Sequence, residues 1–225
     1  MPGVASTGGR AIRLRDGIRA GAPLAPAPFA FGVSFGVLAQ AAGMGIVAPI
    51  VMSATTFAGS AQFAAASILD ENGTVLAAIL AAVLLNARYA PMSIAAATSF
   101  EGRPLRRLAA SQLIVDESWA IAARGGGRFD LGVLLGIGLL FYPLWVGGTA
   151  LGALAGDVVG DPERLGLDAA FPALFLALLV PQVRSRRALV AALLAAGTAL
   201  ALLPVAPAGV PIIAASAASL IGLRR

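Results

Sequence analysis

The chain has neither cysteine nor histidine among its 225 residues. The absence of cysteine excludes disulfides and thiol chemistry. The absence of both residues also removes the ligands of most zinc, haem and iron–sulfur sites. The Ser-His and Cys-His nucleophile arrangements are excluded as well. Few enzyme mechanisms remain, so we expect a protein that is not an enzyme and that needs neither a metal nor another cofactor.

Charge is also scarce, since only 12% of the residues are charged against about 25% in soluble domains. Hydrophobic residues make up 59% of the chain, and the mean hydropathy is +0.88. These values predict a chain that spends most of its length in a lipid bilayer. The 16 Lys and Arg against 11 Asp and Glu indicate positive charge retained beside membrane segments rather than nucleic-acid binding.

Long apolar runs set the expected fold, because a helix that crosses a bilayer needs about 20 apolar residues. We predict an all-α, polytopic membrane helical bundle with about 6–8 membrane segments, some of them broken or re-entrant. Residues 1–16 would form a cytoplasmic tail, and residues 17–225 a single transmembrane domain. The apolar segments are expected at 21–43, 46–69, 73–99, 108–123, 131–155, 169–183, 188–203 and 210–223.

Arginine positions predict the orientation, because positive charge stays on the cytoplasmic side. Arginines before the first segment and at Arg224 and Arg225 place both termini in the cytoplasm, in a multi-pass protein of the cell (inner) membrane. Two arrangements of the first half stay open. If segments 46–69 and 108–123 cross fully, the arginines of residues 103–107 lie outside; if both segments are re-entrant, these arginines return to the cytoplasm.

The segment 46–69 carries signs of an interrupted helix. Pro49 and Gly59 weaken it, and Ser60 and Gln62 place polar groups directly after the glycine. Transporters form binding sites where a helix is interrupted, so Gly59, Ser60 and Gln62 are candidate substrate-binding residues. The alternative is that small residues only let helices pack closely.

Close packing is the preferred interpretation for two other small-residue patterns. Gly32 and Gly36 are four residues apart, as are Gly148 and Gly152. Pairs with this spacing allow the backbones of two membrane helices to approach each other. They predict helix contacts rather than a binding site.

Arg88 lies near the middle of an apolar segment, where an arginine costs roughly 2.5–3.5 kcal/mol on insertion scales. The preceding residues Thr74–Ala87 are all uncharged, so its side chain is too deep to reach the interface. Asn86 and Tyr89 share one helical stripe beside it. We therefore predict Asn86, Arg88, Tyr89 and Met92 as substrate-binding residues.

An acidic pair, Asp116 and Glu117, lies in the segment 108–123. On a continuous helix, Gln112, Asp116 and Trp119 would form one stripe. Carboxyl groups in apolar surroundings hold protons more tightly than in water, which suits proton coupling or pairing with a substrate ammonium. The alternative is an amphipathic surface helix with both acids in water.

Taken in order, these motifs resemble the AzlC-type (azaleucine-resistance) branched-chain amino acid permeases from about residue 15 onward. The motifs are Phe57-Ala-Gly-Ser-Ala-Gln-Phe63, Asn86-x-Arg88-x-x-x-Met92, Asp116-Glu117, Trp145…Gly148-Thr149…Gly152 and Asp168-x-x-Phe171-Pro172-Ala173-x-Phe175. The resemblance implies the large subunit of a two-component exporter of branched-chain and related hydrophobic amino acids, with a small AzlD-type membrane subunit as partner. Tyr89 stands where the family often has histidine, and Val115 where it often has threonine, so an imidazole relay is not expected here.

A zwitterionic aliphatic amino acid needs donors for its carboxylate, an acceptor for its ammonium and an apolar pocket. Arg88 and Asn86 would provide the first, and Asp116 or Glu117 the second. Phe57, Phe63 and Met92 are candidates for the pocket. Two other functions stay open: a carrier or channel for another small solute, and a membrane subunit that does not transport.

Overall fold

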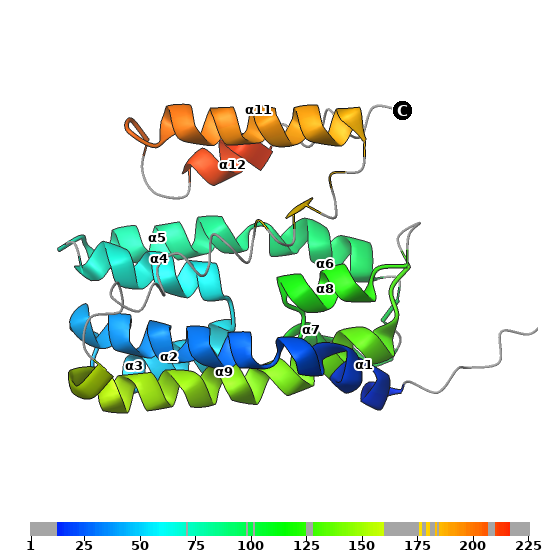
Figure 1. The fold of residues 1–225 in the computed structure, drawn as a ribbon, viewed down its shortest axis with the longest axis horizontal. Helices are drawn as coiled ribbons and strands as arrows, with labels where there is room; N and C mark the ends of the chain where they lie inside the picture. The colour runs from blue at the N-terminus through cyan, green and yellow to red at the C-terminus, as the bar shows by residue number, and fades with distance from the viewer. Residues whose placement is uncertain are drawn as a thin grey trace, which may run out of the picture.

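The computed structural model describes residues 13–70, 72–97, 99–100, 102–124, 128–159, 176, 179–180, 183, 185–206 and 210–216. Within these ranges the fold is helical. Ala123 and Phe129 form an isolated antiparallel β-bridge. The predicted all-α class is confirmed (Figure 1). The helices are α1 Leu14–Gly21, η1 Ala22–Leu24, α2 Pro26–Ala41, α3 Val47–Thr56, α4 Gly59–Asp70, α5 Val75–Asn86, α6 Tyr89–Ala97, α7 Pro104–Ser111, α8 Asp116–Ala122, α9 Leu131–Val159, α11 Arg186–Leu202 and α12 Val210–Ser216.

Membrane-crossing candidates among the described residues agree with three of the predicted segments. Val75–Ala97, formed by α5 and α6, and Leu131–Ala155 of α9 are each long and apolar enough to cross. A third candidate joins Leu14–Leu24 to Pro26–Ala41 with a bend of 63°. Pro26 starts α2 at this bend, where a proline cannot continue the preceding helical hydrogen bonds. The predicted segment 169–183 lies almost wholly outside the described residues.

The predicted segment 46–69 forms a hairpin made of α3 and α4. Phe57 adopts a left-handed conformation with φ 44° and ψ 47°, which ends α3 and turns the chain. Gln62 Nε2 then donates to Ser53 Oγ at 2.7 Å across the two arms. Both arms join the rest of the chain at the left-hand end of Figure 1, so this segment returns to the end from which it enters.

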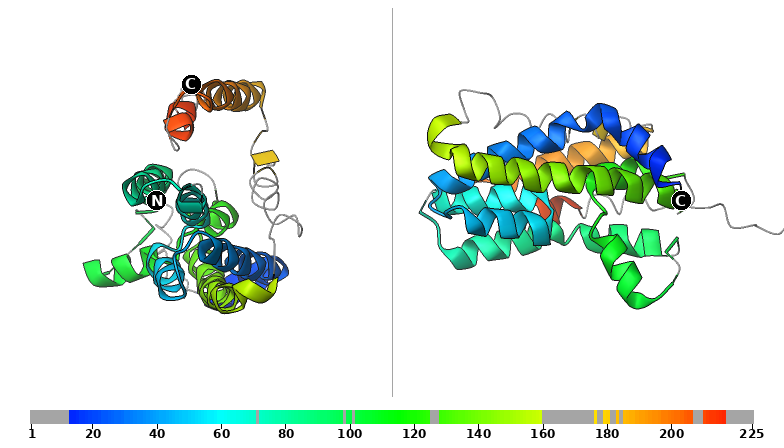
Figure 2. Two further views of the ribbon diagram at one scale, coloured as in Figure 1. Left: turned by 90° about the vertical axis from the view of Figure 1, so that its left-hand side faces the viewer. Right: turned by 90° about the horizontal axis from the view of Figure 1, so that it is seen from below.

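The predicted segment 108–123 is a second hairpin, made of α7 and α8. The chain leaves the helix after Ser111 and is extended at Val115 before α8 begins at Asp116. The single helical stripe expected through Gln112, Asp116 and Trp119 is therefore wrong, because two helices share that stretch. This hairpin enters from the opposite end of the bundle, and α7 projects away from α2 and α9 in both views of Figure 2.

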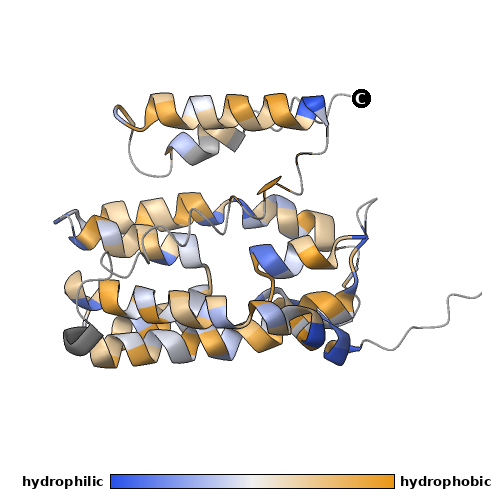
Figure 3. Cartoon of the chain, in the orientation of Figure 1, coloured by the Kyte–Doolittle hydropathy of each residue, from blue (hydrophilic) through white to orange (hydrophobic). Residues whose placement is uncertain are grey.

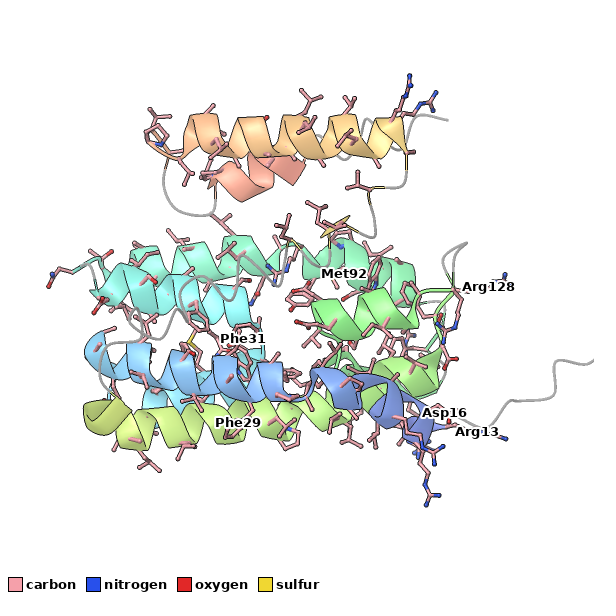
Figure 4. The ribbon with its side chains drawn as sticks, in the orientation of Figure 1. Arg13, Asp16, Phe29, Phe31, Met92 and Arg128 are labelled. Atoms are coloured by element: carbon pink, nitrogen blue, oxygen red, sulfur yellow. The ribbon has the colours of Figure 1, made fainter. Side chains whose placement is uncertain are left out.

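Arginines lie together at one end of the bundle, which we call the arginine end. Figure 4 shows Arg13 and Arg128 at this end together with Asp16. Here α1 and α9 begin, and the chain passes from α6 to α7. Both hairpins return to the end from which they enter, as the arrangement with re-entrant segments requires; the side of the membrane on which the arginines lie stays a prediction.

A close contact between α2 and α9 forms the centre of the bundle. A methyl group added at Gly36 would overlap the backbone of Thr149 and Ala153, and one added at Gly148 would overlap the carbonyl of Phe29. Glycine at these positions lets the two backbones touch, so the predicted packing role of the Gly-xxx-Gly pairs is confirmed. Phe35 is completely buried beside this contact.

The C-terminal helices lie on the other side of α5. The predicted segment 188–203 corresponds to α11, which packs against α12, and α12 contacts α5. No residue of α11 is buried, although part of its surface packs against α12. The site described next lies on the opposite side of α5 and α6.

Candidate substrate site

Three interrupted helices meet near the middle of the bundle. The breaks lie at Phe57–Ala58 between α3 and α4, at Ala87–Arg88 between α5 and α6, and at 112–115 between α7 and α8. The first residues of α4, α6 and α8 therefore lie close together. Figure 3 shows this as a hydrophilic start of α8 beside apolar helices.

Arg88 joins these three elements. Its Nη1 donates to Ser60 Oγ of α4 at 2.7 Å, and its Nη2 donates to Asp116 Oδ2 of α8 at 2.9 Å. The side chains of Arg88 and Asp116 are 26% and 21% exposed. The guanidinium carbon also lies 5.2 Å from the ring centroid of Tyr89, a distance at which a cation is attracted to an aromatic face. Arg88 is thus half-buried in the bundle, with polar companions from two other helices.

The two hairpin tips touch each other beside this ion pair. Gln112 Nε2 donates to the carbonyl of Thr55 at 2.8 Å, and Tyr142 of α9 donates to the carbonyl of Ala54 at 2.8 Å. Both carbonyls belong to the last turn of α3, where a helix leaves its acceptors without internal partners. The end of α3 is thereby satisfied by side chains from α9 and from the other hairpin.

A separate buried cluster fixes the α3–α4 hairpin to α9. Ser53 Oγ and Thr149 Oγ1 lie 2.8 Å apart, Trp145 Nε1 donates to Gln62 Oε1 at 3.0 Å, and the amide of Ala58 donates to the same oxygen at 3.2 Å. The side chains of Ser53, Gln62 and Thr149 are fully buried. This polar cluster, defined by Ser53, Gln62, Trp145 and Thr149, has partners for its donors and acceptors.

Of the predicted site residues, Ser60, Arg88, Tyr89 and Asp116 are brought together directly. Glu117 follows Asp116 in the first turn of α8. Gly59 begins α4 and Asn86 ends α5, so both adjoin the breaks. Met92 is partly exposed one turn beyond Arg88 (Figure 4).

Two of the predicted substrate-binding residues, Gln62 and Phe57, instead contact other residues of the bundle core. Gln62 belongs to the polar cluster, and Phe57 is buried with its ring edge-on to Tyr142 at 5.1 Å. Asn86 differs, because its buried Oδ1 makes no hydrogen bond within the described part of the chain. No group of three or more acidic side chains that would hold a metal ion occurs among the described residues.

Sequence reasoning missed the contacts that Ser53 and Tyr142 make. Each is a polar side chain in an apolar run, which is the signal that identified Ser60 and Arg88. Thr149, which bonds Ser53, and Ala54, which bonds Tyr142, are each more than 80 residues away along the chain, so spacing alone did not connect them.

Comparison with known proteins identifies the family of the chain. The family model described as AzlC protein matches residues 23–159, which include the polar cluster, both hairpins and Arg88. The chain belongs to the AzlC family. The resemblance drawn from the motifs is thereby confirmed.

Relatives in this family are named as membrane proteins or transport proteins. An uncharacterized membrane protein of Archaeoglobus fulgidus is 33% identical over 181 residues, 79% of each chain. The branched-chain amino acid transport protein AzlC of Bacillus subtilis is 29% identical over 154 residues, 67% of this chain and 60% of the relative. The inner membrane protein YgaZ of Escherichia coli is 26% identical over 177 residues, 73% of this chain and 69% of the relative. No solved structure matches the chain.

Proposed function

We propose that this AzlC-family protein is a secondary transporter that exports branched-chain and related hydrophobic amino acids. The observation that carries the proposal is the half-buried Arg88, which is held at the meeting point of three broken helices by Ser60 and Asp116. A guanidinium at this depth is typical of a substrate pathway. The relative from Bacillus subtilis named as a branched-chain amino acid transport protein supports the substrate class.

In this proposal the substrate carboxylate binds the guanidinium of Arg88. A carboxylate matches the planar donor fork of arginine and can replace Asp116 as its partner. Asp116 is then released to receive the substrate ammonium. The buried Oδ1 of Asn86 is a second acceptor near the same break, and Met92 offers apolar contact to the aliphatic side chain.

We assign Asp116 and Glu117 to proton coupling. Both acids lie in the first turn of α8 at the tip of a hairpin, where they are close to the cation that binds the substrate. Gln62, whose side chain bonds Ser53 and Trp145, is assigned to holding the α3–α4 break rather than to substrate contact.

The protein would work in the inner membrane with the arginine end in the cytoplasm, because positive charge is retained there. We place both termini in the cytoplasm for the same reason. A small AzlD-type membrane subunit would be its partner, by analogy with the two-component systems that the family motifs imply. Measurement of amino acid export tests all of these assignments.

Export of valine, leucine and isoleucine from cells loaded with dipeptides tests the proposal. Cells with the chain and the small membrane protein encoded beside it should hold less of each amino acid than cells without them. Arg88→Ala should abolish this difference while the protein still inserts, and Arg88→Lys should retain part of it because the charge stays. Arg15→Ala, an exposed arginine of α1, is the matched control.

Unchanged valine export by Arg88→Ala would remove Arg88 from the mechanism. A chain that exports none of these amino acids but confers tolerance to another solute would be a carrier of different specificity. Glu117→Gln tests proton coupling, since its export should no longer respond to an imposed proton gradient.

A further inference from the structure

An open groove lies between α6 and α7, where the chain turns at the arginine end of the bundle. Its volume is about 360 Å³, the size of a small-molecule site, roughly 300–1,000 Å³. Ser93, Ala97 and Phe100 line it from α6 and the residues after it, and Arg107, Leu108 and Ser111 line it from α7. The groove therefore combines a cation and hydroxyls with apolar side chains.

The groove lies where a membrane-crossing helix ends. Ala97 is the last residue of the crossing candidate Val75–Ala97, and it is also part of the groove lining. A helix that crosses the hydrocarbon core places the residues after its end among the lipid headgroups. The groove therefore extends from the acyl chains of the bilayer into the headgroup layer.

The helix α7 has an arginine face and a leucine face. Arg106 and Arg107 lie on one side, with Arg103 directly before the helix, and Leu105 and Leu108 lie on the other. The two leucines are 77% and 68% exposed, and no residue of α7 is buried. Such a helix, which projects away from α2 and α9 (Figure 2), is typical of a segment at the membrane–water boundary. Arg107 and Leu108 both line the groove, so the groove follows the border between the two faces.

The arginines of α7 lack acidic partners in the part of the chain that the structure describes. Arg103, Arg106 and Arg107 form neither an ion pair nor a side-chain hydrogen bond with the described residues. The hydroxyl of Ser93 also has no partner among them, whereas that of Ser111 donates to the carbonyl of Leu108 at 2.7 Å. Arg107 and Ser93 are therefore the donors that the groove offers to an anion.

We propose that this groove binds an anionic phospholipid of the bilayer. Its phosphate would lie against Arg107 and Ser93, and its acyl chains against Phe100, Leu108 and the leucine face of α7. Arginine pairs with phosphate through charge-assisted hydrogen bonds, and basic pockets between membrane helices bind anionic headgroups. A phospholipid covers both the polar and the apolar lining with one molecule, which a soluble phosphate does not. The site would be present whichever solute the protein transports.

Lipid binding to the full chain, purified in detergent, tests the site. The probes are dioleoyl-phosphatidylglycerol and dioleoyl-phosphatidylcholine, which share their acyl chains and differ in net charge. Native mass spectrometry measures the bound fraction of each. Phosphatidylglycerol should bind at least about fivefold more tightly, the effect of one basic residue beside an anionic lipid. Equal affinity for the two lipids would overturn the proposal.

Arg107→Gln tests the residue that lines the groove. It should weaken the binding of phosphatidylglycerol by about fivefold and leave that of phosphatidylcholine unchanged. Arg106 is equally exposed but does not line the groove, so Arg106→Gln is the matched control and should change the affinity by less than about twofold. Equal losses in the two variants would show a diffuse attraction to positive charge and would contradict a site in the groove.

Quenching by brominated lipids tests where the lipid binds in a bilayer. Because the chain has no native cysteine, Leu105→Cys on α7 and Leu80→Cys on α5, both at exposed positions, can each carry one bimane label. In nanodiscs of phosphatidylcholine, a small fraction of phosphatidylglycerol with brominated acyl chains should quench the α7 label more than the same fraction of brominated phosphatidylcholine. The α5 label should respond equally to both. Equal quenching of the α7 label by the two lipids would place the lipid elsewhere and overturn the proposal.

Two competing occupants give different results. Complete displacement of phosphatidylglycerol by inorganic phosphate would show a site for a soluble anion and overturn the proposal. A chain without lipid preference, whose Arg107→Gln variant no longer binds the small membrane subunit, would have a protein interface in the groove, and the proposal would again be wrong. A chain that binds phosphatidylglycerol as expected but exports no valine would contradict the proposed function and leave the lipid site standing.

Discussion

The two hairpins have the same outline but differ in what holds them. The α3–α4 hairpin is fixed by the buried polar cluster and packs on both α2 and α9. In the α7–α8 hairpin, α7 buries no residue. Its tip contributes Ile114 and Val115 to the core, and α8 packs on α9, but the polar contacts of Asp116 and Gln112 are partly exposed. The first hairpin is thus a scaffold fixed by buried polar contacts, whereas the polar contacts of the second are the ones that can exchange.

The largest expected effect is at the α2–α9 contact that supports the fixed hairpin. Gly148→Leu should leave no folded protein, because its side chain would overlap the backbone of Phe29 and Val33, and overpacking already costs about 1–3 kcal/mol where side chains can move aside. Gly147→Leu is the control, since no atom lies within 4 Å of the position of its Cβ. Protein yield and size-exclusion profiles measure the difference, and a folded Gly148→Leu chain would contradict the account.

Asp116→Asn should separate transport from stability. The neutral amide removes the charge partner of Arg88 while keeping the shape, so valine export should fall at least about tenfold. Thermal unfolding in detergent should change less than it does for Gln62→Leu. A large loss of stability with normal export would make the α7–α8 tip part of the scaffold.

Gln62→Leu should have the converse effect. It removes one hydrogen-bond partner each from Ser53 Oγ, Trp145 Nε1 and the amide of Ala58, and an unsatisfied buried group costs about 1–3 kcal/mol. Denaturant unfolding should therefore show a loss of about 2 kcal/mol. Gln112→Leu at the other tip serves as the comparison and should lose less, since Gln112 is partly exposed; equal losses would remove the distinction between the two hairpins.

Tyr142→Phe should have the smallest effect. It deletes one hydrogen bond to the carbonyl of Ala54 and keeps the ring against Phe57. Hydrogen bonds between membrane helices average about 0.6 kcal/mol, so the unfolding midpoint should fall only slightly. A loss as large as that of Gln62→Leu would show that the end of α3 depends on this bond.

Much of the fold was predictable from hydropathy and from small-residue spacing. The crossing segments at 73–99 and 131–155 and the Gly-xxx-Gly contacts follow from local patterns. The reversal of the chain after α3 did not follow, because it depends on a left-handed Phe57, a residue with no special preference for that conformation. The break before α8 was missed because apolar residues continue through Leu113, Ile114 and Val115.

The site was predictable as a set of residue types but not as a set of contacts. Arg88, Ser60 and Asp116 each stand out as polar groups in apolar runs, and the structure joins them. Gln62 stands out in the same way but lies in the polar cluster instead. Which neighbour each group meets depends on the hairpin geometry, and hydropathy carries no information about it.

The meeting of the two tips has a consequence for how the protein responds to voltage. In the proposed transporter, the stretch that holds Arg88 and Asp116 lies between the two membrane faces, so part of the membrane potential falls across it. A charge that crosses the whole potential gains or loses about 2.3 kcal/mol per 100 mV. The electric field of the cell would thus act on this one ion pair more strongly than on any arginine at the surface.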